Sequence, residues 1–335
     1  MQSRSSFAVI VASLLALSAG CSSGSKQFQA IPASGPEIQA HGELISRGAY
    51  TFAKYSIPTA RSGANRIVTG PDGALWFTEQ GAAKLGRVTT TGSFKEIQMV
   101  SGTAPSHVAS AYGQLWVTDA NLFQINAVTP AGTITQYQAA SSTRGVAGGV
   151  GERIWFTEFE AGYVSILDIS TGASAEYVVP TRNALPYEVA FGGNPDQIWF
   201  TEYGASKIGR MTATGSFTQF ATRSQPQSLV FGPDGALWFT ETSANKIGRM
   251  TMTGTETDYA LPTQHAGPVA IAAGPDGALW FTEYTASKIG RITTSGRITE
   301  TPTPDAHANP VGITTGPDHH IWFVENRANA IVRLL

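Results

Sequence analysis

The sequence predicts an all-β fold: a seven-bladed β-propeller with four-stranded blades, closed by an N-terminal strand that completes the C-terminal blade. Two observations support this prediction. Every tryptophan of the 335-residue chain lies in one repeated motif, and consecutive tryptophans are 39 to 44 residues apart. The last repeat also ends one strand short. A four-stranded unit of about 40–45 residues with a Trp signature is typical of a propeller blade. The tryptophans are Trp76, Trp116, Trp155, Trp199, Trp238, Trp280 and Trp322.

Each repeat contains four short runs that we expect to be strands, named a to d from the centre outward. Between strands a and b, Gly232-Pro233-Asp234-Gly235 favours a turn, because Pro presets φ, Asp bonds its own backbone and Gly adopts positive φ. Apolar residues on both faces of strands a and b suit blades packed between two neighbours. A β-solenoid is the alternative, which the four-strand unit and the count of seven disfavour. In the clearest repeat the expected strands are 229–231, 237–241, 246–249 and 255–259.

The two ends of the repeat array complement each other. The final run, Ala330–Leu335, matches strand c, and the chain ends there without a strand d. Residues Gly48–Tyr55 resemble the strand d at Gly215–Phe220. An N-terminal strand in the last blade would close the ring and remove its open edges. The propeller is therefore predicted to span residues 49–335.

The N-terminus resembles a bacterial lipoprotein signal. Arg4 precedes an apolar run over residues 7–17, and Ser18-Ala19-Gly20 leads into Cys21, the one cysteine of the chain. The run is too short for a transmembrane helix, which needs about 20 apolar residues. We expect residues 1–20 to be a secretory signal peptide and Cys21 to be lipidated. An ordinary secreted protein with a chance cysteine is the alternative. Residues 21–48, rich in Ser, Gly, Gln and Ala, are predicted to be a flexible tether.

The amino-acid composition restricts the classes of partner that the protein can bind. The formal net charge is −2 and 14% of the residues are charged, which excludes the basic stripe of a nucleic-acid-binding protein. A single cysteine excludes an internal disulfide framework. We expect a monomer that is secreted across the inner membrane and anchored to the cell envelope only by its lipid. Its propeller would lie in the periplasm or outside the cell and bind a small molecule or an envelope protein at the channel mouth.

The repeats resemble those of the virginiamycin B lyase family. The resemblance rests on tandem Gly-Pro-Asp-Gly-x-Leu-Trp-Phe-Thr-Glu and Lys-Ile-Gly-Arg-x-Thr-x-x-Gly units and covers about residues 49–335. It implies a Mg²⁺-dependent carbon–oxygen lyase that opens the ester-closed ring of streptogramin B antibiotics by elimination. Such a reaction uses a general base with a pKa near the working pH, as histidine has, and a cation that stabilises the developing negative charge.

The functional positions implied by that resemblance carry different residues here. The family's base histidines follow the proline that opens strand a in the last two blades, where this chain has Val269 and Val311. Neither side chain can take a proton. Asn309 stands where a metal carboxylate is expected, and Glu325 is a weak candidate for the other metal carboxylate.

A different polar set occupies the first two positions of strand a. Blades 1 to 4 are polar and ionisable there, whereas blades 6 and 7 are apolar. A pocket with converging polar groups and an apolar wall is the default ligand site. Glu188 and His107 would form an acid/base pair, and Arg66 or Arg144 would hold a carboxylate. Ordinary loop polarity near solvent is the alternative. The candidate ligand-binding residues are Arg66, His107, Arg144, Tyr187 and Glu188.

Each strand b ends in an acid, which we expect to serve the scaffold by accepting backbone amides or by pairing with the strand c arginines; a cation-binding ring is the alternative. These acids are Glu79, Asp119, Glu158, Glu202, Glu241, Glu283 and Glu325. Two functions stay open. The first is an envelope lipoprotein that binds a ligand or partner, and the second is a lyase that opens streptogramin B or another cyclic ester with Mg²⁺.

Overall fold

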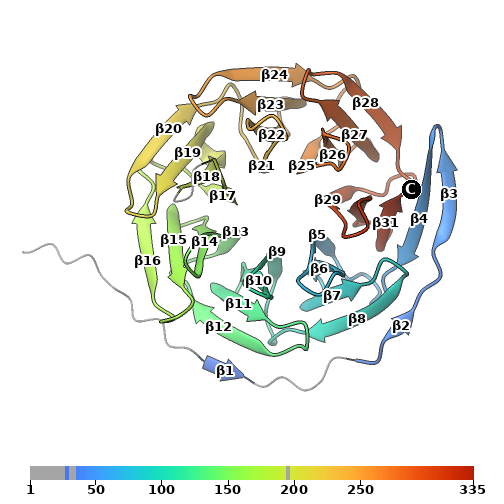
Figure 1. The fold of residues 1–335 in the computed structure, drawn as a ribbon, viewed down its shortest axis with the longest axis horizontal. Helices are drawn as coiled ribbons and strands as arrows, with labels where there is room; N and C mark the ends of the chain where they lie inside the picture. Colours follow the sequence, from blue (N-terminus) through green and yellow to red (C-terminus); the bar gives the residue numbers. More distant parts are fainter. Residues whose placement is uncertain (1–26, 30–34, 194–196) are drawn as a thin grey trace, which may run out of the picture.

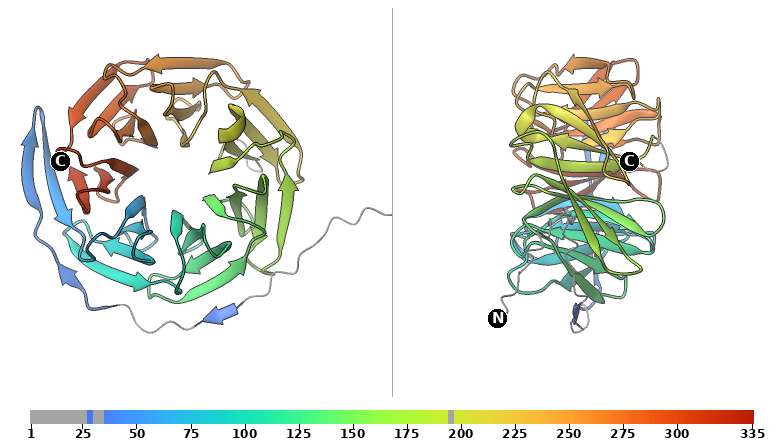
Figure 2. Two further views of the ribbon diagram at one scale, coloured as in Figure 1. Left: turned by 180° about the vertical axis from the view of Figure 1, so that it is seen from behind. Right: turned by 90° about the vertical axis from the view of Figure 1, so that its left-hand side faces the viewer.

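The computed structural model describes residues 27–29, 35–193 and 197–335. Seven antiparallel sheets stand side by side in a ring around a central channel (Figure 1), and the side view shows a flat disc (Figure 2). The predicted all-β, seven-bladed propeller is confirmed. The predicted signal peptide and Cys21 lie outside the described residues. No helix in the described part of the chain is long and apolar enough to cross a bilayer.

Each blade has four strands in sequence order from the channel outward. Blades 1 and 2 comprise β5 (Ala64–Thr69), β6 (Leu75–Glu79), β7 (Lys84–Val88) and β8 (Ser93–Gln98), then β9 (Pro105–Ala111), β10 (Gln114–Asp119), β11 (Gln124–Val128) and β12 (Ile134–Gln138). Blades 3 and 4 comprise β13 (Thr143–Gly148), β14 (Arg153–Glu158), β15 (Tyr163–Asp168) and β16 (Ser174–Val178), then β17 (Pro186–Phe191), β18 (Gln197–Glu202), β19 (Lys207–Thr212) and β20 (Phe217–Ala221). A 3-10 turn, Tyr203–Ala205, follows β18.

The remaining blades repeat this order. Blades 5 and 6 comprise β21 (Leu229–Phe231), β22 (Leu237–Glu241), β23 (Lys246–Met250) and β24 (Glu256–Ala260), then β25 (Pro268–Ala273), β26 (Ala278–Glu283), β27 (Lys288–Thr293) and β28 (Ile298–Pro302). Blade 7 comprises β29 (Pro310–Thr315), β30 (Ile321–Glu325), β31 (Ala330–Leu334) and β4 (Tyr50–Ser56).

The ring closes as predicted. Strand β4, from the start of the chain, pairs antiparallel with β31, from its end, with Lys54 opposite Val332. Figure 1 shows these blue and red strands side by side. Both ends of the chain therefore share one sheet, and closure depends on backbone hydrogen bonds between segments far apart in the sequence.

Part of the expected tether is packed against the ring. Strand β3 (Glu43–Arg47) pairs with β4 as a fifth strand of blade 7, β2 (Ile38–Gln39) pairs with β8, and β1 (Gln27–Gln29) pairs with β12. The outermost strand of a blade exposes unpaired backbone groups that an extended segment can bond. The prediction of a flexible tether reaching residue 48 therefore has to be corrected. Strands β2 and β3 are short and mostly exposed, so they lack the apolar alternation that marks a strand in the sequence.

A repeated turn aspartate organises blades 1, 5, 6 and 7. Asp72 accepts a hydrogen bond from Trp76 Nε1 at 2.8 Å and pairs with Arg87 Nε at 2.6 Å. The same arrangement recurs around Asp234, Asp276 and Asp318. The strand c arginines in these blades thus bond the turn aspartate, and their predicted pairing with the strand b acids is wrong. The tryptophans are buried in clusters between neighbouring blades.

A ring of threonines links each blade to the next. In blades 1 to 6 the residue before the strand b acid is threonine. Its hydroxyl bonds the backbone of two neighbouring blades. Thr240 Oγ1 accepts from Ser228 N at 3.1 Å and donates to Val269 O of the following blade at 2.9 Å. Blade 7 has Val324 there, and Asn326 Nδ2 instead donates to Ala64 O of blade 1 at 2.7 Å. These bonds fix the inner ends of the strands that carry the candidate site.

Candidate functional site

The candidate residues lie in a repeated β-bulge. In six blades the pairing of the innermost strand with its neighbour shifts register just after the strand begins. In blade 1, Asn65 and Arg66 together stand opposite Thr78. A bulge of this kind bends the strand and re-aims a side chain, and such bulges are common beside functional sites. The first two positions of strand a, which are polar in blades 1 to 4, are therefore the two bulge residues.

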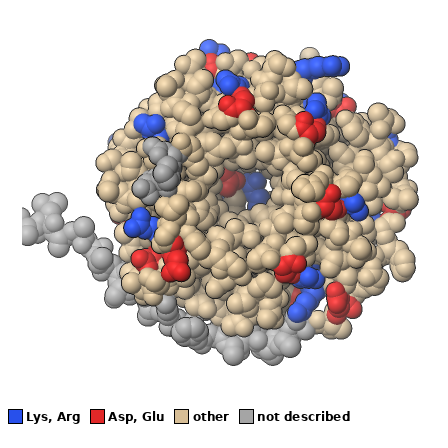
Figure 3. Space-filling view, viewed as in Figure 1, with Lys and Arg blue, Asp and Glu red and all other residues tan. Residues whose placement is uncertain are grey.

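The second bulge residue faces the channel. A cavity of about 320 Å³ occupies the centre of the ring, and Arg66, His107 and Glu188 contribute to its lining together with Ser228. Figure 3 looks down this channel and shows acidic and basic side chains within it. The volume is at the lower end of the range for small-molecule sites, about 300–1,000 Å³.

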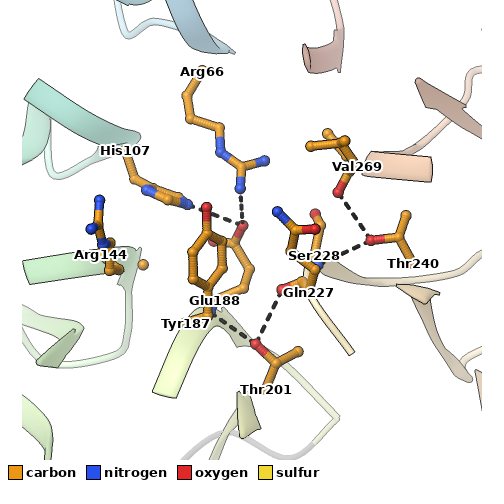
Figure 4. Close-up of polar contacts among 12 residues, drawn as sticks. Arg66, His107, Arg144, Tyr187, Glu188, Thr201, Gln227, Ser228, Thr240 and Val269 are labelled. Carbon is orange, nitrogen blue, oxygen red and sulfur yellow. Dashed lines mark hydrogen bonds and ion pairs between the residues drawn. The ribbon is translucent and has the colours of Figure 1, made fainter. Parts of the chain in front are cut away.

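Two predicted residues from different blades converge on the carboxylate of a third (Figure 4). Arg66 Nη2 lies 3.2 Å from Glu188 Oε2, and His107 Nε2 lies 3.5 Å from the same oxygen. Arg66 belongs to blade 1, His107 to blade 2 and Glu188 to blade 4, so the ion pair crosses the channel. The Arg66 and Glu188 side chains are only 11% and 14% exposed. This contact is a nearly buried ion pair between blades that are not neighbours.

Ser106 extends the network toward the rim. Its hydroxyl lies 3.0 Å from His107 Nδ1, and Arg144 Nη1 donates to Ser106 Oγ at 3.5 Å. A hydroxyl that donates to Nδ1 leaves the proton of a neutral imidazole on Nε2, facing Glu188. The tautomer thus follows from the neighbours. Within the described residues Arg144 has no ion pair, and its guanidinium lies 5.5 Å above the Phe159 ring.

Burial sets the protonation states. Burial, followed by the Arg66 charge, lowers the pKa of His107 to about 4, although Glu188 acts in the opposite direction. Burial would raise the pKa of Glu188, but the Arg66 charge and hydrogen bonds outweigh it and keep this pKa below 4.5. At neutral pH the site therefore contains neutral His107 and ionised Glu188. His107 is suited to donate a hydrogen bond and unsuited to act as a general acid.

Tyr187 supports the site from one side. Its ring meets His107 edge-on at 5.4 Å and Phe159 at 6.0 Å. The structure thus brings all five predicted residues into one neighbourhood. Arg66, His107 and Glu188 line the cavity, whereas Arg144 and Tyr187 lie beside it. Sequence reasoning did not select Ser106 as a site residue or mention Phe159; the position of Ser106 next to His107 on the same strand was the available signal.

Two glycines allow the inner strands to approach each other. A Cβ on Gly145 would come within 2.7 Å of Tyr187 O, and one on Gly312 within 2.9 Å of Arg66 Cα. Any larger residue would therefore push apart β13 and β17, or β29 and β5. Their small size keeps Glu188 and Arg66 close enough to pair across the channel.

The comparisons with known proteins identify the family. The sequence model of the virginiamycin B lyase family matches residues 38–223 and 142–335. The chain belongs to the virginiamycin B lyase family. A streptogramin B lyase structure is 32% identical, with a TM-score of 0.81, and the alignment covers 85% of this chain and 97% of that one. No curated protein matches the chain.

Other solved structures agree with the propeller fold. A catalytically inactive virginiamycin B lyase from Staphylococcus aureus, solved with quinupristin, is 30% identical with a TM-score of 0.80 over 85% of this chain and 99% of that chain. A hydrazine synthase from Kuenenia stuttgartiensis is 12% identical with a TM-score of 0.68 over 82% and 96% of the two chains, which indicates a shared fold alone.

In this member of the virginiamycin B lyase family, blades 5 to 7 supply the apolar side of the cavity. Its lining there includes Leu229, Ala270, Ile271 and Ile313. Val269 and Val311 are first bulge residues and are absent from that lining; Val311 is buried in the cluster between blades 7 and 1. The predicted apolar wall is therefore present, but the residues that follow these two valines form it.

The residues around Glu325 do not fit the Mg²⁺ that the family resemblance implies. Glu325 is fully buried at the end of β30, and its neighbours are Asp305 and Lys54. Burial and the neighbouring Asp305 raise the pKa of Glu325 to about 8, and Lys54 Nζ already pairs with Asp305 at 2.5 Å. Asn309 donates through its amide nitrogen to Tyr284 O at 3.1 Å. Lys54 already neutralises Asp305, and Asn309 donates through its amide instead of accepting, so these residues do not make a cation site.

The strand b acids differ from blade to blade. Asp119 accepts the Ala104 and Asn121 amides, and Glu158 accepts the Ala140 amide and the Ser165 hydroxyl, so these two acids have the predicted scaffold contacts. Another group is buried without a well-formed hydrogen bond and has a raised pKa, chiefly because of burial. Its members are Glu79, Glu283 and Glu325, each with a pKa of about 8, and Glu241, with a pKa of about 7.

Proposed function

We propose that this chain is a small-molecule-binding member of the virginiamycin B lyase family that has no streptogramin lyase activity. The observation that carries the proposal is the Arg66–Glu188–His107 cluster, which lines a cavity of about 320 Å³ opposite an apolar wall. An apolar pocket with a few convergent polar groups is the usual form of a ligand site. The fixed charges would orient the ligand, and the apolar wall would contact its body.

The chemistry favours binding over elimination. Abstraction of a proton beside a carbonyl needs a base whose pKa lies near the working pH. Valine occupies both positions at which the family resemblance implies base histidines, Val269 and Val311. His107 is neutral at pH 7, and its Nδ1 lies 3.0 Å from the Ser106 hydroxyl. Its pKa of about 4 lies far below neutral pH, so it would be a weak base.

The charge balance indicates the class of ligand. Arg66 is neutralised by Glu188, whereas Arg144, beside the cavity, has no ion pair within the described residues. A carboxylate on the ligand would form charge-assisted hydrogen bonds with Arg144, each contributing about 1.5–3 kcal/mol. An organic anion with an apolar body matches both sides of the site.

The cellular setting is also part of the proposal. Residues 1–20 have the pattern of a signal peptide, and Cys21 follows the small residues that precede a lipidation site. A lipid on Cys21 would anchor a monomeric propeller to the bacterial cell envelope and leave the channel mouth open to a small molecule or an envelope protein. Replacement of Cys21 by Ser should release the protein from the membrane fraction and abolish labelling by a fatty acid.

Lyase activity on another cyclic ester is the second candidate. Membership of the family and the likeness to a streptogramin B lyase structure favour it. Such a reaction would have to use the polar groups of blades 1 to 4. It differs from binding in one observable way, because a lyase consumes its ligand.

A thermal-shift screen of organic anions tests the proposal. A true ligand stabilises the chain by RT ln(1 + [L]/Kd), so its effect rises with concentration. We expect a hit whose shift is lost in His107→Ala and Arg144→Ala, while Arg297→Ala, at an exposed distant site, serves as the matched control. Equal binding by the two site variants would overturn the assignment of the site. Mass spectrometry of the recovered hit shows whether it has been consumed.

A further inference from the structure

One cluster of acids lies outside the channel and has no role in the proposed function. Glu241 ends β22, and Glu256 and Asp258 lie on the adjoining outer strand β24. Oxygen atoms of these three carboxylates all lie within 4.8 Å of one another. Their side chains are nine-tenths buried or more: Glu241 is 0% exposed, Glu256 is 9% and Asp258 is 5%. Three buried carboxylates at this separation repel one another strongly unless a cation lies between them.

Part of the cluster already has a donor: the Arg223 backbone amide donates to both oxygens of Glu256, at 3.2 and 3.1 Å. Both oxygens of Glu241 and Oδ1 of Asp258 are buried without a well-formed hydrogen bond. Lys246 Nζ lies 3.1 Å from Asp258 Oδ2, and Arg223 Nη1 lies 3.5 Å from the same oxygen. These two cations approach the cluster from its exposed side, since their side chains are 34% and 65% exposed. Within the described residues, neither Lys246 nor Arg223 therefore gives these oxygens of Glu241 and Asp258 a well-formed hydrogen bond.

Comparison with the other blades shows that the third acid is unusual. Glu256 stands opposite Met250 in the pairing of β23 with β24. Most other blades place an apolar residue in this register position, and the six equivalents are Phe52, Phe94, Ile134, Ser174, Phe217 and Ile298. Blades 1 and 6 each have two acids and a lysine at the corresponding place. These are Glu79, Glu96 and Lys84 in blade 1, and Glu283, Glu300 and Lys288 in blade 6. Glu256 therefore brings a third carboxylate into a position suited to an apolar side chain, and burying a charge is costly unless that charge is balanced as well as hydrogen-bonded.

We propose that Glu241, Glu256 and Asp258 bind a Ca²⁺ ion at the rim of blade 5. Carboxylate oxygens are the ligands of hard cations. Ca²⁺ accepts six to eight oxygens in flexible geometry, whereas Mg²⁺ requires a near-ideal octahedron and retains its waters. The ion would give the unpartnered oxygens of Glu241 and Asp258 a positive partner.

This site is independent of the channel. Its acids lie at the outer part of one blade, whereas the proposed ligand site lies at the centre of the ring (Figure 1). Loss of cation binding would therefore leave the proposed ligand binding untouched.

The test uses the purified full chain after treatment with EDTA and transfer to chelator-free buffer. Its melting temperature is measured against Ca²⁺ and, in a separate series, Mg²⁺, each up to about 10 mM, which covers the Kd range of about 10⁻⁴–10⁻³ M found for extracellular Ca²⁺ sites. We expect Ca²⁺ to raise the melting temperature by a few degrees once its concentration exceeds Kd about tenfold. Mg²⁺ should have a smaller effect at the same concentration.

Variants locate the effect. Glu256→Ile, which copies Ile298 of blade 6, should lose the Ca²⁺-dependent shift and melt no lower than wild type in EDTA. Asp258→Asn provides a second variant should Glu256→Ile fail to fold. Glu300→Gln, the matched change in the two-acid cluster of blade 6, should keep the full shift. An unchanged melting temperature in Ca²⁺, an equal shift in the blade 5 variants or a larger shift with Mg²⁺ would overturn the proposal.

Discussion

Arg66 and Glu188 form an ion pair of 3.2 Å across the central channel, although they come from blades 1 and 4 and are 122 positions apart in the chain. The pair exists because two features place their backbones. The bulges turn both side chains toward the axis, and Gly145 and Gly312 let the innermost strands approach closely. The pair holds a charged, nearly dry group at the centre of the ring, where a ligand would meet it.

Removing one partner of this ion pair should lower the free energy of unfolding more than removing both partners. Arg66→Met leaves Glu188 charged and unpaired, and loss of one partner of a buried pair costs about 3–5 kcal/mol. The double variant Arg66→Met with Glu188→Met removes both charges, and such replacements are often close to neutral. Urea unfolding of the wild type, the single variant and the double variant measures the difference. A double variant that is less stable than the single one would contradict this account of the pair.

Stability should decline as the pH rises from about 4.5 to about 8. Burial raises the pKa of Glu79 and Glu283 to about 8 in the folded chain, against 4.5 when unfolded. The folded state then binds more protons than the unfolded state within this window, so raising the pH favours unfolding. Glu79→Gln with Glu283→Gln remains neutral at every pH and should flatten the slope. Melting temperatures at several pH values, compared between this variant and wild type, provide the measurement.

The Gln variant has to be compared with wild type because titration of His107 changes the stability with pH in the opposite direction. Its folded pKa of about 4 lies below the ordinary value of 6.5, so its contribution to stability is lost as the pH falls through that range. His107 is present in both proteins and cancels in the difference. Parallel pH profiles for the Gln variant and wild type would show that the two glutamates are ionised in the folded chain.

Loss of one hydroxyl from the threonine ring should lower the free energy of unfolding more than loss of a hydroxyl at the surface. Thr240→Val keeps the size of the side chain but leaves Ser228 N and Val269 O without this partner. Leaving buried polar groups unpaired costs about 1–3 kcal/mol each. Thr257→Val, at an exposed position on the outer strand, is the matched control. Equal unfolding free energies for the two variants would show that the ring of threonines does not hold the blades together.

Ring closure by the N-terminal strand can be tested by deletion. Removal of residues 49–57 takes away β4 and leaves blade 7 with three strands and an open edge. Open edges promote aggregation, so we expect a lower melting temperature and aggregation detectable by light scattering. Full solubility and an unchanged melting temperature would contradict the role of β4 in closure.

The sequence was sufficient for the fold and for part of the site. The Trp spacing and the missing last strand predicted seven blades and their closure, because each blade repeats the same local contacts. The polar positions of blades 1 to 4 were visible, but the pairing of Arg66 with Glu188 was not, since it depends on how the bulges aim side chains across the ring. The docking of residues 43–47 was missed because an exposed fifth strand needs only backbone hydrogen bonds. The third acid of blade 5 became significant only once the strand register was known.

Ring opening of quinupristin is the measurement that tests the central claim most directly. The purified chain is incubated with quinupristin and Mg²⁺, and the mass and chromatographic retention of the antibiotic are followed over time, with a streptogramin B lyase as the positive control. Val269 and Val311 occupy the base positions implied by the family resemblance, and loss of a general base costs about 10²–10⁴-fold in rate. Our account predicts that the antibiotic stays cyclic for at least a hundred times longer than with the control enzyme. Mg²⁺-dependent linearisation at a comparable rate would contradict it.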